Sequence, residues 1–173
     1  MKFATGATAL VLFGGCTGLN VGDFGSGTSG TGRTGTTGTM TGGSGGGSSA
    51  GAEQLCVDTI NQYRATLGLA PYERWTGAET CADSQSQSDS MTGQAHGAFG
   101  QCGELAQNEC PGWPPPADKM ITGCLDAMWK EGPGDFNAGH GHYINMSSNR
   151  YTLVACGFYT TAKGEIWSVQ DFN

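Results

Sequence analysis

Basic residues are scarce in this sequence. Its 173 residues hold 8 lysines and arginines against 15 aspartates and glutamates, so the formal net charge is -7, and the pI is near 4.7. A nucleic-acid partner requires a basic surface that faces the phosphates, and this composition excludes one. The excess of acidic residues otherwise indicates mainly that the protein is kept soluble by its net charge.

Long apolar runs are also lacking. The stretch at residues 7–13 follows one basic residue, Lys2, and small residues lead from it to Cys16. It is too short to cross a bilayer as a helix, but this order of segments is typical of an export signal. We therefore expect residues 1–16 to direct export to the cell envelope or the extracellular space.

Seven cysteines are an odd number for an exported chain, so one of them needs a separate explanation. Cys16 resembles the acceptor cysteine of a bacterial lipoprotein signal, which would anchor the chain to a membrane. Phe13 stands where such signals usually carry Leu, so plain secretion after cleavage nearby stays open.

If Cys16 is lipidated, the other cysteines form an even set that predicts three disulfides in an oxidising compartment. They are Cys56, Cys81, Cys102, Cys110, Cys124 and Cys156. Six cysteines allow fifteen pairings, and the sequence does not choose among them. A bridge between Cys102 and Cys110 is one guess, because it would close the short loop around Glu104.

Residues 17–52 consist almost entirely of Gly, Ser and Thr. Such a segment has too little apolar surface to offset its ordering entropy, so it predicts a disordered tether. A flexible linker of this length reaches on the order of 30 to 36 Å, which suits a domain held away from a membrane. A glycosylated spacer is equally compatible with this composition.

Residues 53–173 carry the periodic patterns of a folded domain. Cys56, Ile60, Tyr63 and Leu67 repeat at helical spacing before Gly68 and Pro71, and further helices are predicted over 77–90 and 121–130. Residues 97–116 are predicted to form a loop with a short strand near 105–108. Strands over 151–160 and 165–172 form a hairpin. Helices followed by a hairpin predict an α+β domain with an antiparallel sheet.

Histidine is the scarcest chemically useful residue, and two of the three, His140 and His142, lie in one glycine-rich turn at 139–146. The spacing fits either a site or a solvated loop. Gly-His-Tyr at 141–143, Ala-Cys-Gly at 155–157 and the Asn61 to Arg64 segment together resemble the CAP superfamily of cysteine-rich secretory proteins, antigen 5 and plant pathogenesis-related 1 proteins. The resemblance implies a three-layer α-β-α sandwich with a small antiparallel sheet.

The resemblance also implies a surface cleft in which two histidines and two glutamates converge. Residue by residue, the tetrad is His96, Glu104, Glu131 and His142. Glu109 competes with Glu104 for its place, because Ala106-Gln107 fits bacterial members only if one residue is missing before it.

The tetrad suggests three functions. His96 and His142 are ligands suited to zinc, and carboxylates with water would suit magnesium or calcium. We favour a binding module that holds a metal or small ligand and meets a lipid, glycan or protein partner. One alternative is a metal-assisted hydrolase with Glu104 or Glu131 as general base. The other is a structural envelope protein whose His/Glu network binds nothing. The sequence contains neither a nucleophile elbow nor a His-Glu-x-x-His helix.

Overall fold

The computed structural model describes residues 51–173. The predicted export signal, lipidation of Cys16 and all but the last two residues of the predicted tether lie outside this described part. Within residues 51–173, no helix has the length and apolar character needed to cross a bilayer.

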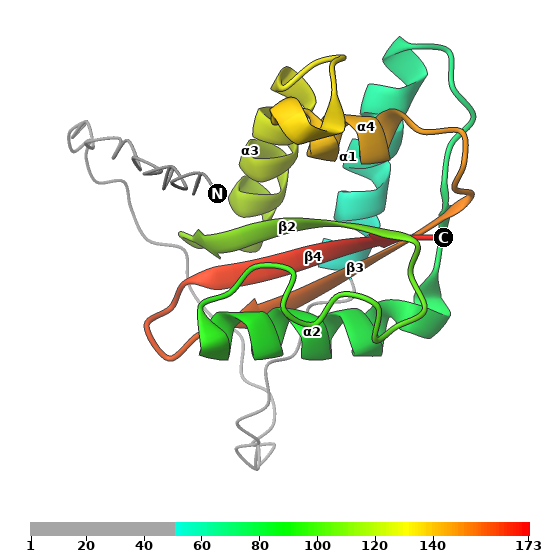
Figure 1. Ribbon diagram of the computed structural model, residues 1–173. Coiled ribbons are helices and arrows are strands. Elements are labelled where there is room, and N and C mark those ends of the chain that lie inside the picture. The colour runs from blue at the N-terminus through cyan, green and yellow to red at the C-terminus, as the bar shows by residue number, and fades with distance from the viewer. Residues whose placement is uncertain (1–50) are drawn as a thin grey trace, which may run out of the picture. The chain divides into compact units, whose positions relative to one another are not determined.

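The described chain forms three layers around a four-stranded sheet of order β1-β3-β4-β2. The strands are β1 (Glu73–Arg74), β2 (Ala106–Trp113), β3 (Leu153–Thr160) and β4 (Ile166–Phe172). One face is covered by α2 (Glu79–Thr92), and the other by α1 (Ala52–Thr66), α3 (Ala117–Lys130) and α4 (Gly141–Ser147), as Figure 1 shows. Two short 3-10 helices complete the fold, Thr76–Ala78 and Phe136–Ala138. The predicted α+β sandwich is therefore confirmed.

The sheet is mixed rather than wholly antiparallel. Strands β2, β4 and β3 pair antiparallel, whereas β1 pairs parallel with β3 through Glu73 and Arg74. Strand β1 was not predicted from the sequence, because two residues are too few to show an alternating pattern.

The helices and strands that carry the site differ from prediction in three places. Residues 141–147 form a helix, α4, where a turn was predicted. Strand β2 continues past Asn108 to Trp113, with a register shift between Cys110 and Trp113 that accommodates Pro111 on an edge strand. Helix α3 begins at Ala117, four residues early, directly after Pro116.

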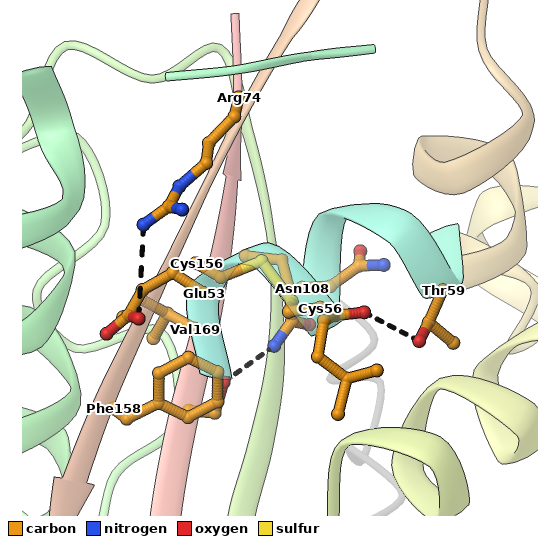
Figure 2. Close-up of a disulfide and its surroundings, with 12 residues drawn as sticks. Glu53, Cys56, Thr59, Arg74, Asn108, Cys156, Phe158 and Val169 are labelled. Carbon is orange, nitrogen blue, oxygen red and sulfur yellow. Dashed lines mark hydrogen bonds and ion pairs between the residues drawn. A yellow bond between two sulfur atoms is a disulfide. The ribbon is translucent and has the colours of Figure 1, made fainter. Parts of the chain in front are cut away.

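All six cysteines of the domain form disulfides, as predicted. Cys56 pairs with Cys156, Cys81 with Cys102, and Cys110 with Cys124. The guessed Cys102 to Cys110 bridge is wrong, because Cys102 meets α2 while Cys110, on β2, meets α3 on the other face of the sheet. Figure 2 shows the Cys56–Cys156 bridge joining α1 to β3 beside Phe158 and Val169.

A buried arginine joins α1 to α4. Arg64 is only 2% exposed, and its guanidinium donates to the carbonyls of Ala70, Met146 and Ser148 at 2.8 Å each. It also lies over the ring of Tyr72, 3.6 Å from the centroid. Hydrogen bonds from a charged donor are among the stronger ones, so Arg64 fixes the C-terminal end of the segment that carries His142.

Candidate functional site

One side of the site is the contact between Glu131 and His142. Glu131 directly follows α3, and its Oε2 accepts hydrogen bonds from the backbone N–H groups of His142 at 3.1 Å and Tyr143 at 3.3 Å. These are first-turn donors of α4 that have no partner within the helix. Its Oε1 accepts from His142 Nδ1 at 2.5 Å. Glu131 therefore caps α4 and orients the imidazole with the same carboxylate.

The other side is built around His96, in the loop between α2 and β2. Its backbone is left-handed, with φ of 60°, and its N–H donates to Glu109 Oε2 at 2.6 Å. Its Nδ1 lies 2.9 Å from Gln107 Oε1. Gln107 faces Asp171 across the β2–β4 pair and donates its amide N–H groups to Asp171 and Gln85. The amide oxygen of Gln107 is thus the atom left for the imidazole, so Nδ1 of His96 is the donor.

Both histidines are therefore held in the same tautomer. Because Nδ1 carries the proton in each neutral ring, the lone pair lies on Nε2. No residue within 51–173 makes a hydrogen bond to Nε2 of His96 or His142. The two rings are each about half to two-thirds buried, with side-chain exposures of 44% and 36%.

His96, Glu131 and His142 line one cavity of about 300 Å³. Gln107, Asn108, Asn145, Phe136 and two glycines, Gly139 and Gly141, form the rest of its wall. Two elements distant in sequence, the loop before β2 and the start of α4, thus present their histidines to the same space. Asn145 holds them in place by donating to Asn108 Oδ1 at 2.9 Å and to the carbonyl of Gln107.

Glu104, the remaining member of the expected tetrad, does not line this cavity. It is 6% exposed, and its oxygens accept the backbone N–H groups of Gly100 and Cys102 and the side-chain amide of Gln85. Its carboxylate is therefore used to close the loop before β2. Of the two glutamates that the sequence left open, Glu109 is the one that contacts His96.

Several buried carboxyl groups lie behind His96, and only Glu109 among them was singled out from the sequence. Burial, together with the nearby charges of Asp89 and Asp171, raises the pKa of Glu109 to about 7, although the backbone N–H of His96 acts in the opposite direction. Burial likewise raises the pKa of Asp171 to about 7 and that of Asp89 above its ordinary value. The sequence carried no local signal for the burial of Asp171, which follows the polar Gln170 in its strand.

His140, the third histidine, is not part of the cavity wall. Its Nδ1 donates to the carbonyl oxygens of Glu131 at 2.6 Å and Gly132 at 3.0 Å. Its ring also occupies the space beside Gly134, where a Cβ atom would collide with it. The two histidines of the 139–146 segment therefore separate into one that faces the cavity and one that secures the loop after α3.

The donor set at the cavity fits zinc through two imidazoles. A different group, Cys102, Glu104 and Asp171, is the one trio of potential ligands whose atoms cluster within the described residues. It does not fit a metal, because Cys102 is bonded to Cys81 and both Glu104 oxygens accept backbone N–H groups. Any ion at the cavity would therefore rest on His96 and His142, with its other positions left to water or ligand.

Comparison with known structures shows the same fold at low sequence identity. BmVAL-1 aligns with a TM-score of 0.61 and 14% identity over 75% of this chain and 80% of that one. Na-ASP-1 gives 0.57 and 12% over 75% and 40%. Hookworm platelet inhibitor gives 0.53 and 11% over 72% and 70%. No curated protein sequence is significantly similar to this chain.

The sequence itself matches the model of a protein family over residues 57–172, which span the described domain from α1 to the end of β4. The matched family is the cysteine-rich secretory protein family, abbreviated CAP. The chain belongs to this family.

Proposed function

We propose that this domain is an extracellular binding module that takes up a zinc ion at Nε2 of His96 and His142. The observation that carries the proposal is the hydrogen-bond partner of Nδ1 in each ring, from which the tautomer follows. Metal-binding histidines usually donate their second N–H to a carboxylate or carbonyl group, which fixes the ring and raises the basicity of the ligating nitrogen. Glu131 supports His142 in this way, and Gln107 supports His96.

The same contacts favour binding over hydrolysis. A general base must be free to accept a proton from water near the metal. Glu131 already accepts from three donors, and Glu104 is buried in the loop before β2 with three donors of its own. Neither candidate base of the hydrolase alternative is free, so the proposal is a site for binding.

Isothermal titration with zinc tests the assignment. His96→Ala and His142→Ala are each expected to weaken zinc binding by well over tenfold, since each removes one of two protein ligands. His140→Ala is the matched control, because it removes an imidazole of the same segment that does not line the cavity. Zinc binding that is absent in the wild type, or lowered equally by His140→Ala, contradicts the proposal.

We further propose that Cys16 is lipidated and tethers the domain to a membrane. The even set of six disulfide-bonded cysteines supports this, because it leaves Cys16 without a partner in the domain. Detergent partitioning and intact mass of the wild type and of Cys16→Ser provide the test. A wild-type chain that stays in the aqueous phase with a free thiol at Cys16 refutes the tether.

A further inference from the structure

A second cavity, larger than the first and lined by more apolar side chains, adjoins the histidine cleft. It has a volume of about 490 Å³ and shares His96, Gln107, Phe136 and Asn145 with the cleft. Apolar residues make up most of the remaining wall, namely Phe99, Leu105, Ala106, Ile144 and Tyr151, and Arg150 stands among them. We refer to this second cavity as the aromatic groove.

The aromatic groove gathers apolar surface that a soluble domain would normally cover. Phe99, Leu105 and Phe136 are 49%, 64% and 64% exposed, and they are three of the five large hydrophobic residues left exposed in the described chain. Grouped exposed apolar residues mark binding surfaces more often than scattered ones do. Phe99 and Phe136 also pack against no other ring within residues 51–173, whereas Tyr151 packs against Phe172.

Arg150 is the second unmatched group of the groove. Within the described residues its guanidinium has no hydrogen bond and no ion pair. The other two arginines of the domain are both engaged: Arg64 with three carbonyl groups, and Arg74 with Glu79. In a chain with a net charge of -7, an unpaired guanidinium beside apolar walls is the feature that an anionic ligand would complement.

We propose that the aromatic groove binds a small aromatic carboxylate. The ligand ring packs against the free faces of Phe99 and Phe136, where offset or edge-to-face contacts add to simple burial. Its carboxylate pairs with Arg150, whose planar fork of donors matches two carboxylate oxygens. One ligand therefore supplies a partner both for the two phenylalanine rings and for the guanidinium of Arg150.

Other occupants fit the wall less well. An extended peptide would bring backbone amides into the groove, and the carbonyl of Gln107 on its wall is already taken by Asn145. Amide groups buried without partners are costly, so a peptide is disfavoured. An alkyl carboxylate would satisfy Arg150 but would leave the two phenyl faces without the ring contact that they can make.

The test is titration of the full chain with 2-naphthoate in the presence of a chelator, which removes zinc from the assay. The result is then independent of the metal proposal. Arg150→Gln is expected to weaken binding at least tenfold, and Phe99→Leu severalfold, since leucine keeps apolar bulk but has no ring. Neutral 2-naphthylmethanol is expected to bind the wild type about as weakly as naphthoate binds Arg150→Gln.

Lys163→Gln is the matched control, because it removes one exposed cation of the β3–β4 turn, remote in sequence from the groove. It should leave naphthoate affinity unchanged. The proposal is overturned if Arg150→Gln binds naphthoate as tightly as the wild type, or if Lys163→Gln weakens it equally. Binding of decanoate in preference to naphthoate also overturns it. Unchanged thermal unfolding of Arg150→Gln shows that any loss is not a loss of fold.

Discussion

The two histidines of the cleft reach the same tautomer through different supports. His142 donates to Glu131, a carboxylate that is itself partly exposed. His96 donates to Gln107, a neutral amide, and the negative charge stands one residue farther back, at the buried Asp171. The comparison shows that a ring can be oriented either by a charge near solvent or by a neutral group fixed from the interior. We call Gln107, held by the buried Asp171, the interior support of His96. It makes the orientation of the His96 ring depend on the packing of the sheet.

The disulfide between Cys110 and Cys124 joins these two supports, and its removal has the largest expected effect. Cys110 lies on β2 with Gln107, and Cys124 lies on α3, which ends just before Glu131. The double variant Cys110→Ala/Cys124→Ala is expected to lower the free energy of unfolding by about 3 kcal/mol, as for closure of a loop of this size. Urea denaturation measures the change. A loss below about 1 kcal/mol would mean that packing alone holds the two supports together.

Glu131 is expected to show the next largest effect. Glu131→Ala removes the support of His142 and the cap of α4 together, so we expect zinc affinity to fall about 10- to 100-fold. Glu131→Gln restores an oxygen that accepts the N–H groups of α4, and should therefore recover most of the stability. Calorimetric zinc titration and urea denaturation separate the two roles. Equal zinc affinity in both variants and the wild type would show that His142 needs no carboxylate.

Asp171 makes the interior support sensitive to pH. Burial raises its pKa from 3.8 to about 7 in the folded state. Between these values the folded chain binds more protons than the unfolded chain, so this stabilising contribution is complete below pH about 4 and is lost as pH rises through about 7. Asp171→Asn removes the charge, and should stabilise the protein by about 1 to 3 kcal/mol at pH 8 and hardly at all at pH 4.

Urea denaturation of the wild type and of Asp171→Asn at several pH values checks this expectation. Asp58→Asn, at an exposed position of α1, is the matched control and should not change the pH profile. If the free energies of unfolding of the wild type and of Asp171→Asn differ by the same amount from pH 4 to pH 8, the charge of the buried Asp171 carboxylate does not destabilise the fold.

His140 gives the smallest expected change. His140→Ala removes its hydrogen bonds to the carbonyl groups of Glu131 and Gly132, which should cost about 1 kcal/mol of stability. Its zinc affinity should equal that of the wild type. A loss of zinc affinity without a loss of stability would place His140 at the metal. His96 and His142 would then not be the two protein ligands.

The sequence predicted the layers of the fold better than the site. Helical spacing of Cys56 and Ile60 located α1, and the hairpin of β3 and β4 was predicted from two strand-like runs joined by a short loop. Helix α4 was missed because Gly139 and Gly141 suggest a turn, whereas the cap that Glu131 provides comes from another element. Local pattern does not report such a remote partner.

At the site, His96, Glu131 and His142 line one cavity, and motif order did not distinguish Glu104 from Glu109. Both glutamates lie near the start of β2, and only the folded loop determines which carboxylate meets Gly100 and which meets His96. The Gln107–Asp171 pair depends on strand register, which a single sequence does not fix in advance. The interior support was therefore invisible before the sheet was known.

Gly157 sets how closely α2 lies against the sheet. A Cβ atom there would collide with the backbone of Ala82 and Asp83 in α2. The same strand and helix are joined where Ser86 donates to the carbonyl of Gly157. Helix α2 leads directly into the loop that carries His96, so the thickness of this layer determines the position of that histidine. One added methyl group on β3, on the opposite face of the sheet from α4, would therefore push α2 away from the sheet. The loop that follows α2 would move with it and displace His96 from the cleft.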